Sequence, residues 1–233
     1  MKLLIDVGNT AVKLALCNGE GIQAISADKL DWDTITEVVV GKVGKSEHLT
    51  PYLAEATARQ VPVYEAEVSA TLGQLQCAYP QYQNLGIDRW LAVIAAYYLY
   101  PQQACIIIDS GTATTVDVLS AQGKHLGGWI IPGLDMMMKS LTANTQKVFV
   151  DEDSPFLLAL GKNTPNAVKN GCLAATLGCL YQAIHLLALP QSEVRVLCTG
   201  GYGALLQQHV AESEFIADLV LQGLAYWRLA QGN

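Results

Sequence analysis

The stretch Leu3-Leu4-Ile5-Asp6-Val7-Gly8-Asn9-Thr10 has a counterpart later in the chain, Ile106-Ile107-Ile108-Asp109-Ser110-Gly111-Thr112-Ala113-Thr114. Each stretch is an apolar run that ends in an aspartate, and it is followed by a glycine, hydroxyl side chains and a second apolar run. The pattern predicts two strands joined by a tight turn. Because a carboxylate, a glycine and hydroxyls at such a turn can hold a metal-bound phosphate, two copies indicate a nucleotide cleft between two related halves.

The composition is that of a folded, acidic protein. Of the 233 residues, 51% are hydrophobic and 15% are charged, so the chain can bury a sizeable core and further surface such as a dimer interface. The net charge is −7 and the sequence pI is about 5.0. The 14 basic residues are scattered along the chain, which argues against binding to nucleic acid or to an anionic membrane surface.

Cysteine usage and hydropathy indicate a reducing compartment. The six cysteines form no C-x-x-C pair and most lie in apolar runs, which favours small buried side chains over disulfides or metal ligands. Asp6 interrupts the first apolar stretch, which is therefore not interpreted as a signal peptide. Polar residues interrupt the apolar stretch 172–189, which favours a buried helix over a membrane span. We therefore expect a cytoplasmic protein with no membrane partner.

Alternating strands and helices predict an α/β fold with two halves, 1–101 and 102–233. We expect a loop over 70–85, and a long helix that has Thr164 as its N-cap and Pro165 as its first residue. The predicted strands are 2–7, 11–17, 22–26, 38–40, 61–64, 104–109, 113–119, 125–131 and 194–198. The predicted helices are 46–59, 87–100, 134–143, 165–187 and 215–230.

The first predicted hairpin carries the groups that a phosphate needs. Gly8 lets the backbone approach closely, and Asn9 and Thr10 offer hydrogen-bond donors. Lys13 adds a positive charge, and Asp6 would hold Mg²⁺ through water, because that ion keeps part of its hydration shell. The alternative is a tight turn in which the polar residues serve only the turn itself.

The second hairpin and a late strand extend the pattern. The segment Asp109–Thr115 is richer in hydroxyls than the first copy, which favours phosphate binding at both. The predicted strand 194–198 runs into Gly200 and Gly201, where a flat purine ring could lie against the backbone. An ordinary strand-to-helix turn is the alternative interpretation of these two glycines.

These elements resemble the phosphate and adenosine elements of the acetate kinase, sugar kinase, heat-shock protein and actin superfamily. The resemblance covers nearly the whole chain, and four motifs in order narrow it to type III pantothenate kinase. The motifs are Asp6-x-Gly-Asn-Thr, Gly86-Ile87-Asp88-Arg89, Asp109-x-Gly-Thr-Ala-x-Thr-x-Asp117 and Gly127-Gly128-Trp129-Ile130-Ile131-Pro132-Gly133. The resemblance implies two tandem ribonuclease H-like (actin-like ATPase) halves. It also implies an enzyme that phosphorylates pantothenate with ATP, the first step of coenzyme A synthesis.

The resemblance assigns roles to residues of this chain. It implies an ATP phosphate loop at Asp6, Val7, Gly8, Asn9, Thr10, Ala11, Val12 and Lys13, and a further ATP contact at Thr112. It implies a pantothenate site at Tyr79, Gly86, Ile87, Asp88, Arg89 and Thr164, with Asp88 as the proton acceptor. It also implies K⁺ or NH₄⁺ at Asp109, and a homodimer in which Thr164 serves the neighbouring subunit's site. Ala11 is a departure, because the family more often has a polar residue there.

Several alternatives stay open at this level. Asp88 stands at a predicted helix start, where it can act on a substrate hydroxyl or merely complement the helix dipole. Arg89 can pair with the substrate carboxylate or brace Asp88. A sugar or acetate kinase is the alternative enzyme, and a nucleotide-binding regulator without chemistry is the alternative class. The four histidines show no metal-ligand spacing, and we interpret them as structural.

Overall fold

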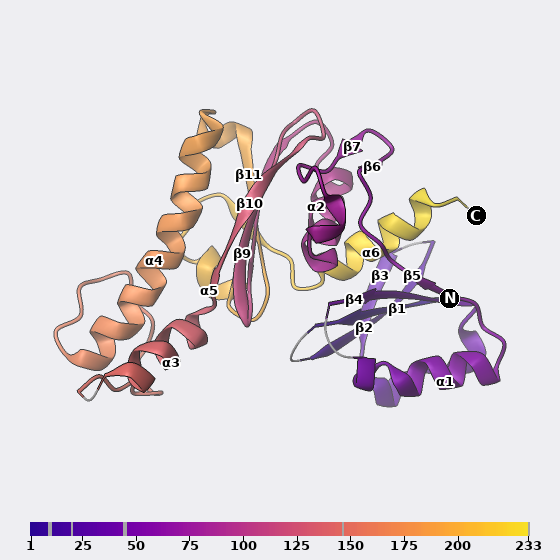
Figure 1. The fold of residues 1–233 in the computed structure, drawn as a ribbon, viewed down its shortest axis with the longest axis horizontal. Helices are drawn as coiled ribbons and strands as arrows, with labels where there is room; N and C mark the ends of the chain where they lie inside the picture. Colours follow the sequence, from indigo (N-terminus) through magenta and orange to yellow (C-terminus); the bar gives the residue numbers. More distant parts are fainter. Residues whose placement is uncertain (9–10, 20, 44–45, 146, 233) are drawn as a thin grey trace. The chain divides into compact units, whose positions relative to one another are not determined.

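The computed structural model describes residues 1–8, 11–19, 21–43, 46–145 and 147–232 (Figure 1). The chain divides into two compact units. Unit 1 consists of Met1–Gln102, Leu119–Gly127 and Asp218–Asn233, and unit 2 consists of Gln103–Val118 and Gly128–Ala217. The five strands of the first large sheet lie within 1–101 and those of the second within 102–233. On the placement of these strands, we propose that the chain consists of the halves 1–101 and 102–233.

The two large sheets share one topology, and this repetition is the architecture that the doubled motif predicted. The first sheet has the order β3-β2-β1-β4-β5 and the second β10-β9-β8-β11-β12. In each, three consecutive strands form an antiparallel meander, and two later strands continue the sheet beside the first strand of the meander. The fold is therefore α/β with two tandem ribonuclease H-like halves.

The first sheet is built from the strongest apolar runs of the N-terminal half. Its strands are β1 (Lys2–Val7), β2 (Val12–Asn18), β3 (Gly21–Ile25), β4 (Glu37–Lys42) and β5 (Val63–Glu65). Alternate residues of β1, namely Leu3, Ile5 and Val7, are fully buried and belong to the core that also contains Ala56 of α1 (Thr50–Ala58). Because side chains alternate along a strand, Leu4 and Asp6 point to the opposite face.

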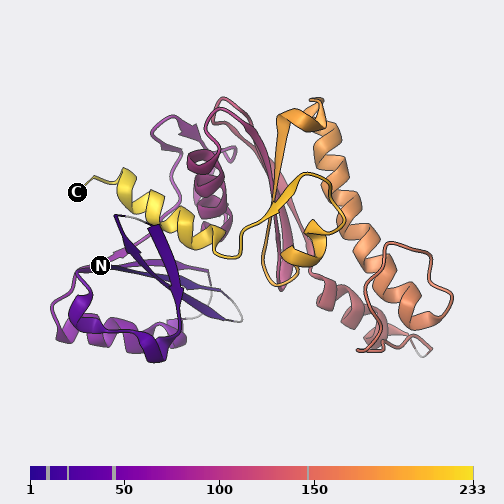
Figure 2. The same ribbon diagram turned by 180° about the vertical axis from the view of Figure 1, so that it is seen from behind.

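Two helices of unit 1, α2 (Ile87–Leu99) and α6 (Leu219–Ala230), pack closely on each other, as both views show (Figures 1 and 2). A Cβ added at Gly223 would lie 1.9 Å from the Leu91 carbonyl oxygen, so the helices cross where α6 has no side chain. A Cβ at Gly41 of β4 would lie 2.8 Å from Leu91 Cδ1. The α2–α6 pair therefore covers the face of the first sheet opposite α1.

The second sheet has a core of its own. Its strands are β8 (Ala104–Ser110), β9 (Ala113–Leu119), β10 (His125–Pro132), β11 (Val194–Thr199) and β12 (Ser213–Phe215). Unit 2 also contains α3 (Leu134–Asn144), α4 (Thr164–Leu187) and α5 (Gly203–Gln207). Buried residues of α4 such as Leu173, Leu177 and Leu180 share one core with Ile106 and Ile108 of β8.

The short elements differ most from the sequence-based expectation. The region 70–85, expected as a loop, contains the two-stranded hairpin β6 (Thr71–Leu72) and β7 (Leu75–Gln76). Neither α5 nor β12 was expected. The helix expected over 46–59 begins at Thr50, and the one expected over 215–230 begins at Leu219. The remaining short elements are the 3₁₀ turns η1 (Ala27–Lys29), η2 (Trp32–Thr34), η3 (Ser46–His48), η4 (Tyr82–Asn84) and η5 (Gln191–Glu193).

The cysteines behave as small apolar side chains. All six are free thiols, and Cys105, Cys172 and Cys198 are buried. Burial raises the pKa of Cys105 to about 12 and that of Cys198 to about 11, so both remain protonated at neutral pH. The interpretation as buried hydrophobic residues is confirmed for these three. Among the described residues, none of the helices combines the length and hydropathy needed to cross a bilayer.

A charged cluster holds the last helix of unit 1. Arg228 Nη2 donates to Glu37 Oε2 at 3.0 Å, and Lys2 Nζ lies 2.7 Å from the other carboxylate oxygen. The Arg228 guanidinium carbon also lies 4.0 Å from the centroid of the Tyr64 ring, and its Nη1 donates to the Gly232 carbonyl oxygen at 2.9 Å. The Arg228 and Glu37 side chains are only 9% and 13% exposed, so their charges are largely removed from water.

Arg228→Leu is expected to lower the free energy of unfolding by about 3 kcal/mol, because Glu37 would lose a buried partner. The measurement is urea denaturation followed by circular dichroism. Arg59→Leu is the matched control, because Arg59 pairs with Glu55 and Asp33 on an exposed surface and should leave the midpoint unchanged. Equal effects of the two substitutions would contradict the role given to the buried cluster.

Candidate active site

The first hairpin places an acid beside a base at the end of β1. Asp6 is the antiparallel partner of Lys13, so both side chains lie on the same face of the sheet. Gly8 N donates to the Ala11 carbonyl oxygen at 3.0 Å and closes the turn. Val7 is buried, whereas Ala11 and Lys13 are exposed and Val12 is partly buried. Asn9 and Thr10, the expected phosphate donors, lie outside the described residues.

Asp88 stands in the first turn of α2, whose N-cap is Gly86. Its Oδ1 accepts a hydrogen bond from Arg89 N at 2.8 Å. A Cβ added at Gly86 would lie 2.6 Å from that same Oδ1, so the missing side chain leaves room for the carboxylate. Ile87 and Asp88 are both partly exposed. A carboxylate in the first turn of a helix interacts favourably with the positive end of the helix dipole.

Tyr79 and Arg89, both expected to contact pantothenate, are in contact with each other in the structure. Arg89 Nη1 donates to Tyr79 Oη at 3.1 Å, and the guanidinium carbon lies 5.8 Å from the centroid of the Tyr79 ring. The Arg89 residue is 5% exposed, so its charge is nearly removed from bulk water. Tyr79 itself is partly exposed. The guanidinium therefore forms a buried, oriented group directly after Asp88 in the chain.

His125 completes this cluster, and sequence reasoning missed it. Its ring lies parallel to the Tyr79 ring, with centroids 6.3 Å apart and an interplanar angle of 10°. Its Nδ1 accepts a hydrogen bond from Ala78 N at 3.4 Å. A lone histidine in an apolar strand gives no local signal of such a role, so only the fold reveals it.

In unit 2, three segments meet at the Asp109 hairpin. Gly111 N donates to the Ala113 carbonyl oxygen at 3.0 Å and closes the turn. Gly133 N donates to the carbonyl oxygen of Thr112 at 3.1 Å, and Thr112 is exposed. A Cβ at Gly133 would lie 2.2 Å from the Gly111 carbonyl oxygen, and one at Gly200 would lie 2.4 Å from Asp109 Oδ1. The glycines therefore serve close packing around the Asp109 carboxylate.

The turn after β11 is tied to the start of α3 by a tyrosine. Tyr202 Oη donates to Asp135 Oδ1 at 2.6 Å, and Tyr202 N donates to the Ser110 carbonyl oxygen at 2.9 Å. Partial burial, followed by the hydrogen bond and charge of Asp135, raises the pKa of Tyr202 to about 12. The hydroxyl therefore remains a donor at neutral pH, and it fixes the Gly200–Gly201 turn against α3.

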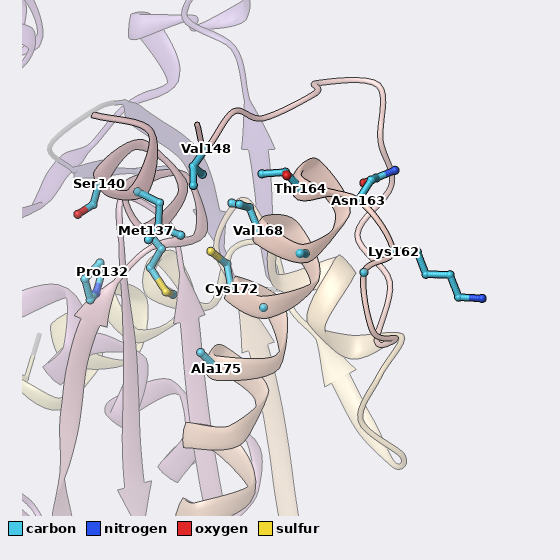
Figure 3. A pocket seen from close by; sticks show the side chains of 14 residues that line it. Pro132, Met137, Ser140, Val148, Lys162, Asn163, Thr164, Val168, Cys172 and Ala175 are labelled. Carbon is cyan, nitrogen blue, oxygen red and sulfur yellow. The ribbon is translucent and has the colours of Figure 1, made fainter. Parts of the chain in front are cut away.

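Thr164 begins α4 and lines a pocket of about 860 Å³ between α3 and α4 (Figure 3). The expectation that Thr164 is the N-cap was wrong: Asn163 takes that position, because its Oδ1 accepts from Asn166 N at 2.9 Å. Thr164 is therefore not used as the cap, and its side chain lines the pocket. Small residues of α4 such as Gly171 and Ala175 line the same pocket, together with apolar residues such as Met137 and Val168.

A metal ion at Asp6 or at Asp109 would have few ligands from the protein. In the described part of the chain, no three His, Cys, Asp or Glu side chains gather in a metal-binding geometry. Asp6 and Asp109 each stand in a separate hairpin. Single carboxylates suit an ion that keeps water or takes phosphate oxygens as its other ligands, as Mg²⁺ does.

Comparisons with known proteins agree on one family. The family model for type III pantothenate kinase matches residues 2–185. A type III pantothenate kinase from Pseudoalteromonas translucida is 53% identical over 227 residues, which cover 97% of this chain and 96% of that protein. One from Colwellia psychrerythraea is 34% identical over 246 residues, with coverage of 96% and 98%.

Solved structures share the fold at low sequence identity. A Baf family protein from Campylobacter jejuni aligns with a TM-score of 0.58 at 21% identity, covering 98% of each chain. A structure from Sinorhizobium meliloti described as a 2-dehydro-3-deoxygalactonokinase gives a TM-score of 0.57 at 15% identity, covering 100% of this chain and 99% of that one. At these identities the similarity establishes the fold alone.

Gly200→Ala is expected to lower the free energy of unfolding by about 2–4 kcal/mol, because φ is +82° there and the added methyl would meet Asp109 and Ser110. Gly201→Ala is the matched control, since its added methyl meets no atom within 4 Å and should change stability by less than about 0.5 kcal/mol. Chemical denaturation of both variants is the measurement. Indistinguishable stabilities would contradict the close packing described around Asp109.

Proposed function

This chain belongs to the type III pantothenate kinase family, and we propose that it transfers the γ-phosphoryl group of ATP to the primary hydroxyl of pantothenate. This reaction is the first step of coenzyme A biosynthesis. The observation that carries the proposal is the carboxylate of Asp88 at the start of α2, with the space that Gly86 leaves beside it. A kinase acting on an alcohol needs such an acceptor for the hydroxyl hydrogen.

Asp88 orients the attacking hydroxyl. Its carboxylate is partly exposed and accepts from Arg89 N through Oδ1, which leaves lone pairs for a hydrogen bond from the substrate. Because phosphoryl transfer passes through a loose transition state, the alcohol loses its proton late. The main contribution of Asp88 is therefore to hold the hydroxyl in line with the phosphorus, and then to receive the proton.

Arg89 and Tyr79 bind the other end of pantothenate, its carboxylate. The support is the orientation of the guanidinium, whose Nη1 is held by Tyr79 Oη inside a nearly closed environment. A guanidinium with little competing water binds a carboxylate strongly and with a defined direction. We therefore favour substrate binding over bracing of Asp88 as the role of Arg89.

ATP is assigned to the two hairpins. Asp6 to Lys13 hold the phosphates, with Asp6 on Mg²⁺ through water and Lys13 supplying charge; the pairing of Asp6 with Lys13 across β1 and β2 supports this. Thr112 contacts the nucleotide, and Asp109 holds K⁺ or NH₄⁺. Both cations would neutralise phosphate charge when bound. The adenosine is assigned to the Gly200–Gly201 turn, whose path Tyr202 fixes.

We further propose a homodimer whose interface contains α4 and completes the pantothenate site with Thr164. Supporting this, Gly171, Ala175 and Gly178 form an exposed face of α4, and added methyls at the two glycines meet nothing within 4 Å. Such a face lets another helix approach closely. The site would then lie at the interface. A cytoplasmic location is part of the same proposal, and its support is the usage of cysteine as free thiols.

The direct test is ADP release by the purified protein with Mg-ATP, K⁺ and pantothenate. Asp88→Asn is expected to bind both substrates and to lose about 10²–10⁴-fold in kcat, because the amide accepts protons poorly. Asp28→Asn is the control, since Asp28 lies in an exposed turn. Unchanged kcat in Asp88→Asn would refute the acceptor role. Turnover of a sugar without turnover of pantothenate would refute the proposed substrate.

If each active site contains residues of both subunits, two variants with impaired activity should complement each other. Thr164→Val is expected to raise the KM for pantothenate by about tenfold, because it removes a hydrogen bond to the substrate. When Thr164→Val and Asp88→Asn subunits are mixed and reassociated, half of each heterodimer's sites regain both native residues. Activity at low pantothenate should then approach about a quarter of the wild-type value. Activity that only equals the average of the two parents would contradict a site completed in trans.

A further inference from the structure

The turn between β9 and β10 holds the chain segment that carries Tyr79. Gln76 N donates to the Gly123 carbonyl oxygen at 2.9 Å, and Gln76 forms an isolated parallel bridge with Lys124. Two residues later, Ala78 N donates to the Nδ1 of His125 at 3.4 Å. Alternate amides of one extended segment are thus bound, the first by backbone and the second by the histidine ring.

His125 also sets the plane of the Tyr79 ring. The two rings are parallel within 10°, and His125 is 3% exposed, so its ring is held in place by its surroundings. The Tyr79 ring is less buried and would otherwise rotate about its two side-chain torsions. The hydrogen bond from Ala78 N to Nδ1 is a second contact that orients the imidazole ring.

The phenolic O–H lies in the plane of the Tyr79 ring, so the ring plane sets the direction of the Oη lone pair, which accepts from Arg89 Nη1 at 3.1 Å. A chain of contacts therefore runs from His125 through Tyr79 to the guanidinium of Arg89, all within unit 1. The first contact is the parallel packing of the His125 and Tyr79 rings, and the second is the hydrogen bond from the Arg89 guanidinium to the Tyr79 hydroxyl. An arginine side chain has many rotamers. A fixed acceptor such as Tyr79 Oη restricts them beforehand, so Arg89 loses less conformational entropy when it binds an anion.

We propose that His125 is a positioning residue for recognition of the substrate carboxylate, and that it acts through Tyr79 on Arg89. This inference rests on the proposed function, since it takes pantothenate as the ligand of Arg89. His125 touches neither reacting atom, so its loss should weaken the binding of carboxylate substrate and leave the phosphoryl-transfer step nearly unchanged. A merely structural histidine would instead affect stability and all kinetic constants together.

Two substitutions separate the two contacts of His125. His125→Asn keeps an acceptor near Ala78 N and loses the ring, whereas His125→Phe keeps the ring and loses the acceptor. His125→Asn is expected to raise the KM for pantothenate about tenfold, with kcat and the KM for ATP changed less than about twofold. His125→Phe should restore the KM to within about threefold of wild type. His48→Asn, at an exposed position, is the matched control and should change none of these.

A double-mutant cycle with Tyr79→Phe tests the path. Tyr79→Phe removes the hydroxyl that orients Arg89, so His125→Asn should have little further effect on the KM in that background. Pantothenol, which has an alcohol in place of the carboxylate, should show nearly the same KM with wild type and His125→Asn. Additive effects in the cycle, an equal loss with pantothenol, or a parallel loss of kcat would each overturn the inference.

A readout without turnover separates this inference from the proposed function. In the ¹⁵N spectrum of the free protein, the Arg89 Nε–Hε signal should shift or broaden in His125→Asn and not in His48→Asn. If wild type neither binds nor phosphorylates pantothenate, the proposed function fails while this signal still reports the contact chain. If pantothenate is a substrate and the Arg89 signal is unmoved, the positioning role of His125 is wrong. His125→Phe and Tyr79→Phe allow the same comparison if His125→Asn does not fold.

Discussion

The second half of the molecule depends on backbone segments that approach more closely than any side chain would permit. At the Asp109 hairpin, a methyl group on Gly133 or Gly200 would come within 2.4 Å of hairpin atoms. Interiors are packed tightly enough that such a methyl has no space to occupy. The ends of β8, β10 and β11 can therefore meet only where glycine stands. The position of the Asp109 carboxylate follows from that meeting, and so does the proposed cation site.

The same strand order does not give the two hairpins the same chemistry. Asp6 faces Lys13 across β1 and β2, whereas β9, the second strand of the other hairpin, contains no lysine or arginine. An aspartate beside a lysine suits a phosphate and its bound metal, because both charges of the complex find a partner. A hairpin whose second strand has no basic side chain offers less to a phosphate, which supports the proposed assignment of the monovalent cation to Asp109. The repeated strand order therefore leaves room for the proposed division of roles between the two hairpins.

Sequence predicted what local chemistry determines and missed what tertiary contacts determine. The strands of both meanders were correct because long apolar runs bounded by glycine have few alternatives. The N-cap of α4 was misassigned because Asn163 and Thr164 are both good caps, and only the hydrogen bond to Asn166 N decides between them. In α3, Met138 is buried whereas Met136 is exposed, because helix residues two positions apart point in directions about 200° apart. β12 and α5 are too short for periodicity to indicate them.

The start of α2 shows how two adjacent charged residues avoid competing for one role. Successive side chains of a helix diverge by about 100°. Asp88 and Arg89 therefore leave the helix in different directions. Asp88 is partly exposed beside the space at Gly86, and Arg89 is buried against Tyr79. A short carboxylate close to the helix end suits one precise hydrogen bond, while a long guanidinium reaches a distant group. Pantothenate has its primary hydroxyl and its carboxylate at opposite ends, so this divergence supports the proposed roles of Asp88 on the hydroxyl and Arg89 on the carboxylate.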